Sequence, residues 1–416
     1  MNEPGFLTER RKRAADKALS VPLPDRARHR FRYTDPAALV PGGAVTQALL
    51  DAALPARIDV TLPRAAAEAG VIALPLAQAL AADPGRVAEH LGRIAGPADP
   101  VVAVSLAAFR SAAVVIVPAG ARVTEPIVVR QAADPGAPDA LTATRLLVVA
   151  GRESEASVVE EVTAASGVVH ATAEAHVGDG ARLTLARTAT VARGATAFSC
   201  GAAEVGSDAT LTHLDLGVSS GLLKVETSPA LDGRGGRVEG LGAALVGGRG
   251  RADFRVREDH AGTDTQSRVT WRAVASGKSQ AVFTGLLRIR ERAVRSEGYE
   301  EARALLLSRT ARADVIPELE ISNHDVRCSH GAAVGPVDEE ARYYLMTRGM
   351  SAAEAEALLV EGFVAPVLAR IPVPAEAEAL LVEGFVAPVL ARIPVPAVAE
   401  IVASRVAAGL AAMRGG

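Results

Sequence analysis

The arrangement of apolar and polar positions divides the 416-residue chain into three parts. Residues 1–95 contain short stretches with helical spacing that prolines interrupt. Residues 96–335 contain short runs of Val, Thr, Ala and Leu that alternate with turns rich in Gly and Asp, whereas residues 336–416 return to helical spacing. The pattern therefore predicts a helical N-terminal region (1–95), a β-rich core (96–335) and a helical C-terminal domain (336–416).

The β-rich core contains a loose internal repeat. Related segments start at Val117, Val149, Val177, Val205 and Leu231, at intervals of 32, 28, 28 and 26 residues. Each has an apolar residue, a turn of Gly, Asp or Ser, and then an alternating strand. One such unit cannot bury its apolar face alone, but stacked units share a continuous core. The repeat favours a β-helix; a β-sandwich is the alternative, although its turns are expected about every 8–12 residues.

Local signals predict several elements in the first 121 residues. Helices are expected over Glu9–Ala18, Leu74–Ala81 and Pro84–Ile94, and Asp83 is placed to cap the third of them. The apolar run Val101–Ala121 is interrupted by charged and turn-forming residues, so it lacks the roughly 20 unbroken apolar residues of a membrane-spanning helix. We expect a buried strand there.

The C-terminal domain contains an exact tandem duplication, in which residues 353–374 recur unchanged as residues 375–396. Asp338 precedes one predicted helix, and Ser351 with Glu354 forms an S-x-x-E capping box at the start of the next. Only the first copy has this cap. We therefore expect the first copy to occupy the packed position and the second copy to be an insertion.

Composition narrows the classes of function. The chain has 45 Lys and Arg against 48 Asp and Glu, and this balance argues against coating nucleic acid or an anionic membrane. With 8 Phe, 4 Tyr and 1 Trp, the chain is poor in aromatic residues for stacking bases and needs a core of small aliphatic residues. Two cysteines cannot form a disulfide framework, and the N-terminus lacks an apolar signal, so we expect a cytoplasmic protein.

The clearest candidate chemistry lies in residues 317–335, where Cys328 and His330 are two positions apart. On a strand this spacing places both side chains on one face. A thiolate and an imidazole suit zinc, iron or an iron–sulfur cluster, but two ligands do not complete a site. The others must come from elsewhere in the chain or from a partner. The alternative is a buried cysteine beside a hydrogen-bonded histidine. His324 is a possible accessory group, and Cys200 is expected to be a core residue.

Other chemical groups carry weaker signals. His170, His176 and His213 lie on repeat strands and are expected to be surface or hydrogen-bonded residues rather than ligands. Residues 277–279 read Gly-Lys-Ser, like the end of a phosphate-binding loop, but Arg272 stands where that loop needs a glycine. We therefore expect this chain to bind no ATP.

Three segments resemble one known family. Residues 317–368, which contain the run Cys328–Gly331, closely resemble the C-terminal signature of the SufD branch of the SufB/SufD family, which serves SUF iron–sulfur cluster assembly. Residues 259–293 are similar to the strand segment before that signature, and residues 23–39 to a short Arg-Tyr-Thr segment near the N-terminus. The Cys-Ser-His-Gly run selects the SufD branch, because the SufB branch has a different stretch there. Residues 296–308 depart from the family's Gln/Asn-rich form.

The resemblance implies a mainly β fold, with a right-handed parallel β-helix core flanked by helical N- and C-terminal domains. It implies a heterodimer with SufB through the β-helix, and docking of the SufC ATPase on the C-terminal domain. A transient iron–sulfur cluster would form at the SufB interface, with His330 implicated as a ligand or assembly residue and Cys328 beside it. Apo iron–sulfur proteins would then receive the cluster.

The sequence therefore predicts a non-catalytic scaffold subunit for iron–sulfur cluster assembly. One alternative is a β-helix enzyme that acts on polysaccharides, which needs paired carboxylates on one strand face. Glu258, Asp259 and Asp264 form the only suggestive group, but adjacent residues of a strand face opposite sides. Another alternative is a purely structural subunit without metal ligands.

Overall fold

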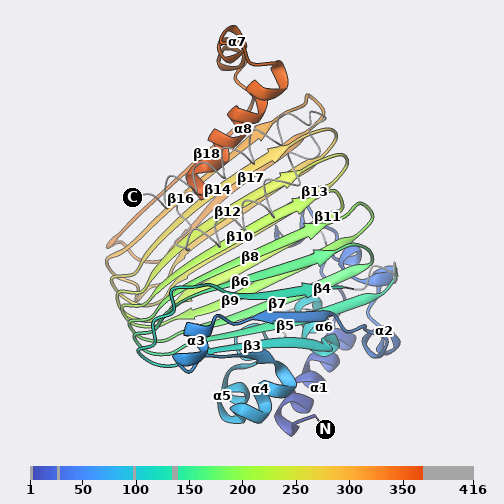
Figure 1. The fold of residues 1–416 in the computed structure, drawn as a ribbon, viewed down its shortest axis with the longest axis vertical. Helices are drawn as coiled ribbons and strands as arrows, with labels where there is room; N and C mark the ends of the chain where they lie inside the picture. Colours follow the sequence, from blue (N-terminus) through green and yellow to red (C-terminus); the bar gives the residue numbers. More distant parts are fainter. Residues whose placement is uncertain (1–2, 26–28, 97–99, 134–138, 369–416) are drawn as a thin grey trace.

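The computed structural model describes residues 3–25, 29–96, 100–133 and 139–368. Its centre is a parallel β-solenoid of about eight turns, in which successive strands alternate between two facing sheets (Figure 1). Helices lie at both ends. The prediction of a mainly β solenoid with helical flanks is confirmed, and the alternative of a β-sandwich is wrong.

Each sheet has nine strands. Sheet A contains, in spatial order, β2 (Ile72–Pro75), β3 (Ser111–Val117), β5 (Leu141–Ala150), β7 (Val168–Val177), β9 (Thr196–Val205), β11 (Leu222–Leu231), β13 (Arg251–His260), β15 (Gln280–Ile289) and β17 (Arg312–Ile321). Sheet B contains β1 (Arg57–Thr61), β4 (Ile127–Ala132), β6 (Glu155–Ala164), β8 (Arg182–Val191), β10 (Thr210–Ser219), β12 (Arg237–Val246), β14 (Gln266–Ala275), β16 (Ser296–Leu306) and β18 (Val326–Pro336).

The predicted repeat corresponds to the corner at which the chain leaves sheet A and enters sheet B. In each of these corners except the last, between β17 and β18, one residue has a positive φ, which glycine adopts freely and which Asp tolerates better than most residues. Such residues in successive corners are Gly120, Glu153, Gly180, Asp208, Gly235, Asp264 and Arg295. The Gly/Asp turns of the sequence repeat therefore mark the position of the left-handed residue in most of the coils.

Small aliphatic side chains fill most of the space between the sheets, as the composition predicted. The later coils contain an aromatic cluster in which the ring of Trp271 lies 6.0 Å from that of Phe254 and 4.9 Å from that of Phe283. Gly242 makes room for it, because a Cβ there would come within 2.6 Å of the indole. Ala and Val thus fill most of the narrow interior, whereas Gly242 leaves the space that the large side chain of Trp271 occupies.

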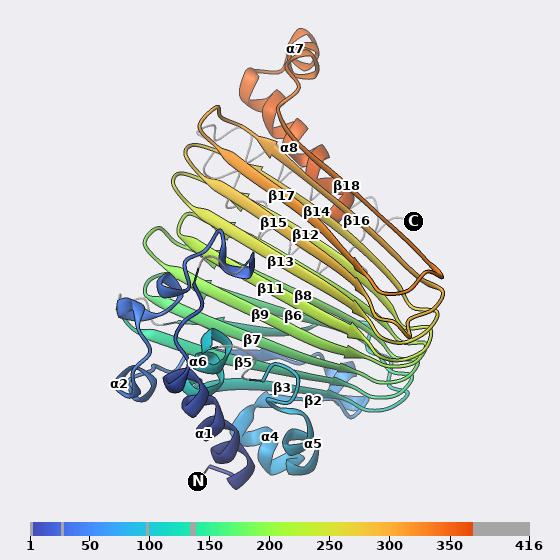
Figure 2. The same ribbon diagram turned by 180° about the vertical axis from the view of Figure 1, so that it is seen from behind.

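The N-terminal region covers the first coils (Figure 2). Its helices are α1 (Gly5–Ser20), α2 (Gln47–Asp51), α3 (Arg64–Glu68), α4 (Leu76–Ala82), α5 (Pro84–His90) and α6 (Pro100–Ala108), with short 3-10 turns at η1 (His29–Phe31), η2 (Pro36–Leu39) and η3 (Pro41–Gly43). The side chain of Asp83 caps α5 as predicted. Strands β1 and β2, which the sequence did not indicate, pair antiparallel with β4 and β3.

One prediction in this region is wrong in part. The run Val101–Ala121 was expected to be a buried strand, but its first eight residues continue helix α6, and only Ser111–Val117 form a strand. Every residue of α6 is buried, so the helix has no polar face and its sequence shows no helical period.

The C-terminal helices are α7 (Glu339–Thr347) and α8 (Ala352–Leu368). Asp338 caps α7, and Ser351 and Glu354 form the predicted capping box of α8. The first copy of the duplication supplies most of α8, and its Val360, Val364 and Val367 pack on the outer face of sheet B. The second copy lies outside the described residues. None of the described helices combines the length and apolarity needed to cross a membrane.

We predict that Trp271→Ala lowers the free energy of unfolding by about 3–5 kcal/mol, because it leaves a cavity among rigid coils. Urea unfolding measured by circular dichroism checks this. The control, Tyr344→Ala, changes a side chain that is 56% exposed and should shift stability by less than about 0.5 kcal/mol. An equal, small shift for both variants would contradict the packing role of Trp271.

Candidate functional site

The candidate site lies at the end of the solenoid opposite the N-terminal helices. Within the described part of the chain, β17 pairs only with β15 and β18 pairs only with β16, so each sheet ends on an unpaired edge. Side chains that face inward on these two strands have no following coil above them in the part of the chain that the structure describes. Leu319, Ile321 and Val334 are 38%, 44% and 45% exposed there. We call this surface, formed by β17 and β18, the open end.

Cys328 and His330 both lie on β18. Cys328 is in register with Gly298 of β16, and His330 with Glu300. Cys328 is half-buried against Leu287 and Ile289 of the interior, whereas His330 is exposed. Because strand side chains alternate, the two share the inward-facing side of the last strand, as their spacing predicted. Burial raises the pKa of the Cys328 thiol.

Glu300 lies in the interior directly below His330. Its side chain is buried, and Gly285 of the facing sheet leaves the space that its carboxyl occupies, since a Cβ there would overlap it. Its Oε1 atom has no hydrogen-bond partner. Burial, followed by the neighbouring carboxylates of Glu258 and Glu318, raises its pKa to about 8. A buried carboxyl group that is largely protonated at neutral pH thus lies beneath the candidate site.

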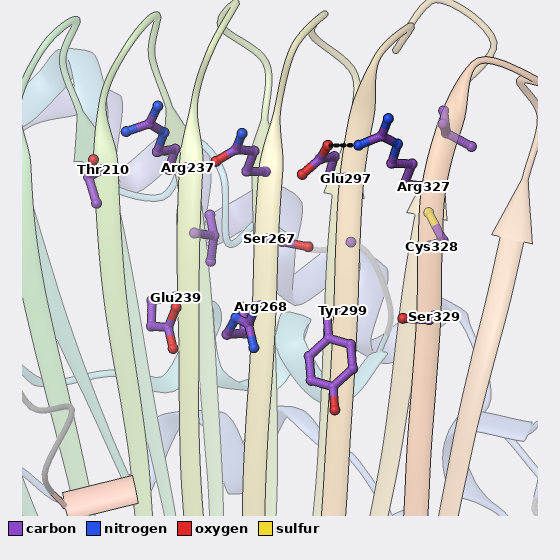
Figure 3. Close-up of a pocket in the computed structure, with 14 residues that line it drawn as sticks. Thr210, Arg237, Glu239, Ser267, Arg268, Glu297, Tyr299, Arg327, Cys328 and Ser329 are labelled. Atoms are coloured by element: carbon purple, nitrogen blue, oxygen red, sulfur yellow. Dashed lines mark hydrogen bonds and ion pairs between the residues drawn. The ribbon is translucent and has the colours of Figure 1, made fainter. Parts of the chain in front are cut away.

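A shallow pocket of about 670 Å³ borders this site along the first residues of β10, β12, β14, β16 and β18 (Figure 3). Arg237, Glu297 and Arg327 form one row across its strands, and Glu297 and Arg327 are ion-paired at 3.5 Å. In a second row Arg268 lies 4.9 Å from the ring centre of Tyr299. Cys328 and Ser329 belong to the pocket's lining, whereas His330 does not.

The other candidate residues do not join Cys328 and His330. Cys200 is buried on the outer face of sheet A beneath Phe31 and Leu39, which confirms the prediction of a core residue. Burial raises the pKa of its thiol to about 11. His324 lies exposed in the turn between β17 and β18. No group of three or more His, Cys, Asp or Glu side chains among the described residues is arranged to hold a metal ion.

The three strand histidines are hydrogen-bonded, as predicted. His170 Nε2 lies 2.7 Å from the carbonyl oxygen of Leu39, and His176 Nδ1 lies 3.1 Å from Glu204. His213 is enclosed between Asp215 and Glu258. Burial opposes its protonation, but the hydrogen bonds to the two carboxylates prevail and raise its pKa to about 9.

The carboxylates that suggested a polysaccharide enzyme are not paired on one face. Glu258 is buried in the interior beside His213, whereas Asp259 accepts hydrogen bonds from Arg290. Sequence reasoning singled out neither Glu300 nor its position below His330. The alternation of residues 296–306 could have shown that Glu300 faces inward, but only the strand register places it beside His330.

We predict that iodoacetamide modifies Cys328 in the native chain and leaves Cys200 intact until urea unfolds it. Cys328 is half-buried at the open end, whereas Cys200 is buried and its pKa of about 11 disfavours the reactive thiolate. Peptide mapping after timed alkylation measures both rates. The Cys328→Ser variant should gain no mass under native conditions; rapid modification of that variant would contradict the placement of Cys200.

Comparison with known proteins agrees with this architecture. The family model for the SUF system FeS cluster assembly SufBD core domain matches residues 131–363. An iron–sulfur cluster assembly SufBD family protein of Mycobacterium tuberculosis is 31% identical over 293 residues, which cover 68% of this chain and 73% of that protein. Iron–sulfur cluster assembly protein SufD of Escherichia coli is 31% identical over 158 residues, covering 38% of this chain and 37% of that protein.

SufD of Bacillus subtilis is 36% identical over 131 residues, covering 31% of this chain and 30% of that protein. The family match spans the solenoid from the end of β4 into α8, and it includes the strand that holds Cys328 and His330. This chain therefore belongs to the SufBD family of the SUF system for iron–sulfur cluster assembly.

Proposed function

We propose that this chain is a SufD-like, non-catalytic scaffold subunit that supports iron–sulfur cluster assembly in the cytoplasm. The observation that carries the proposal is the position of Cys328 and His330 on the inward side of β18, where no further coil among the described residues covers them. A thiolate and an imidazole are suitable donors for iron. A scaffold holds iron and sulfide as cargo, so it needs donors that a partner can complete and later release.

The partner at the open end is SufB in this proposal. Two strand edges that have no partner strand among residues 3–368 as described, together with the exposed Leu319, Ile321 and Val334, form a surface that further strands can extend and bury. SufB thereby forms a heterodimer with this chain through the β-helix, which we take to be right-handed. Burial of these apolar residues supplies the driving force for association.

The cluster site is shared between the two chains. This chain offers His330 and Cys328, and SufB supplies the remaining donors of a transient iron–sulfur cluster. Two donors on one chain bind weakly by themselves, which favours release of the finished cluster to apo iron–sulfur proteins. The bound partner also excludes water from the site, because Cys328 already lies against Leu287 and Ile289.

The SufC ATPase docks on the C-terminal helices in this proposal, and this chain binds no ATP itself. Tyr343, Tyr344 and Met346 of α7 are 70%, 56% and 40% exposed, so α7 presents an apolar surface to solvent. Helix α7 packs against α8, and α8 packs on β12 and β14. Movement imposed on α7 can therefore reach the last coils of the solenoid.

We predict that His330→Ala lowers the cluster yield of the complex at least about tenfold, because it removes a donor whose place water fills poorly. The variant is co-expressed with SufB and SufC and reconstituted anaerobically, and iron content and visible absorbance are measured. His324→Ala, which removes an exposed histidine from the preceding turn, is the matched control and should retain the wild-type yield. An unchanged yield in His330→Ala would remove His330 from the mechanism.

The two docking surfaces should be separable by mutation. We expect Ile321→Asp to weaken SufB binding at least about tenfold, since it places a charge in an apolar contact, and to leave SufC binding intact. Tyr344→Ala should weaken SufC binding and leave SufB binding intact. Pull-downs of the co-expressed complex measure both. Leu19→Asp, at an exposed apolar residue of α1, should change neither; a Leu19→Asp effect equal to that of Ile321→Asp would contradict the proposal.

A further inference from the structure

Glu300 of β16 is a buried carboxyl group without a polar partner. The residue is 2% exposed, and its Oε1 atom has no hydrogen-bond partner. Within the described part of the chain, its side chain also forms no ion pair. An unpaired polar atom in the interior costs free energy, so a folded protein contains few of them. A partner for Glu300 is therefore expected, and its place in the fold shows where that partner lies.

Other acidic side chains of the interior have partners. Asp215 is paired with Arg187 of the neighbouring strand β8. The Oε1 atom of Glu258 lies 3.1 Å from Nε2 of His213, which reaches it from the opposite sheet. The solenoid thus supplies a cation or a ring nitrogen to these carboxylates from a strand close by. For Glu300, the neighbouring strand on the open side is β18.

Strand β18 places His330 directly over Glu300. The two residues are in register, and both side chains face the interior. Neighbouring strands lie about 4.8 Å apart, so an imidazole on one strand can reach a carboxyl group on the other. Cys328 has Gly298 beneath it instead, where a Cβ would overlap Leu287. The coil beneath the candidate site thus offers a polar group to His330 and none to Cys328.

The stacking of the coils gives this contact a direction. A neutral imidazole has one nitrogen that donates a hydrogen bond and one that offers a lone pair. When the first nitrogen donates to Glu300 in the coil below, the second points away from that coil and toward the open end. A carboxyl partner of this kind fixes the tautomer and the orientation of a ligating histidine and raises its basicity. Gly285 of the facing sheet leaves the carboxyl group the space it needs.

We propose that Glu300 is the positioning residue of His330. It accepts a hydrogen bond from one ring nitrogen and directs the other out of the open end, toward the iron that a partner chain helps to hold. The inference rests on the proposed function, because it concerns the same histidine. The partner that covers the open end turns the exposed ring inward over Glu300, and the buried carboxyl group gains its missing contact. Ordering a free side chain on binding costs free energy, and this contact offsets that cost.

The test compares variants of residue 300 in the complex co-expressed with SufB and SufC and reconstituted anaerobically. Glu300→Leu removes the acceptor, and we expect it to lower the cluster yield, measured by iron content and visible absorbance, about 10–100-fold. Glu300→Gln keeps an acceptor oxygen at the same place and should retain at least about half of the wild-type yield. Glu155→Leu changes an exposed glutamate at the start of β6 and is the control, which should leave the yield unchanged.

A double variant separates a positioning role from a structural one. Because Glu300 acts through His330, Glu300→Leu should lower the yield of His330→Ala no further. The unfolding temperature of Glu300→Leu should equal or exceed that of the parent, since this change removes an unpaired polar group from the interior. A full yield in Glu300→Leu would overturn the proposal. Equal losses in the Leu and Gln variants, or a further loss in the double variant, would also overturn it.

His330→Ala separates failure of this inference from failure of the proposed function. A low yield in His330→Ala together with a full yield in Glu300→Leu contradicts the positioning role alone. A full yield in His330→Ala contradicts the role of His330 itself, and the inference about Glu300 then fails with it.

Discussion

The hydrogen-bond ladder between successive coils is the constraint on which the rest of this structure depends. Each parallel strand uses one edge to pair with the coil below and the other to pair with the coil above. A ladder of this kind has two ends. The strand edge at each end is either covered by other segments of the same chain or left available for pairing with another chain. Antiparallel β1 and β2 close the first coils together with the N-terminal helices. The last strands have no such cover among the described residues, and Cys328 and His330 lie there.

The interior of the solenoid is less uniform than a stack of small apolar residues. Arg187 pairs with Asp215, and His213 lies between Asp215 and Glu258, all fully buried. Burying charge is costly unless each group finds partners. Glycines of neighbouring strands provide the space: a Cβ at Gly201 would come within 2.7 Å of the Arg187 guanidinium, and one at Gly240 within 2.7 Å of His213 Nε2. The glycine content of the chain thus serves the interior as well as the turns.

Sequence patterns predicted the structure best where they repeat. They predicted it least well where an element is buried on every side, or where the exposure of a residue depends on the order of strands in a sheet. The spacing of the Gly/Asp turns predicted the solenoid, because most coils have a left-handed residue at the same corner. Helix α6 was misread because it is buried on all sides and shows no periodicity. The spacing of Cys328 and His330 correctly predicted a shared strand face. Their exposure depends on which strand is last, and that follows from the sheet order rather than from any local motif.

The two ends of the solenoid place opposite demands on histidine. At the open end, His330 is exposed on the last strand that the structure describes. At the covered end, His176 is nearly buried, its Nδ1 atom lies 3.1 Å from Glu204, and its ring contacts that of His90 in α5. A buried, hydrogen-bonded side chain is already satisfied within one chain and contributes to packing, whereas an exposed side chain beside an unpaired strand edge is accessible to another molecule. The position of a histidine along the ladder therefore decides which of these roles it can take.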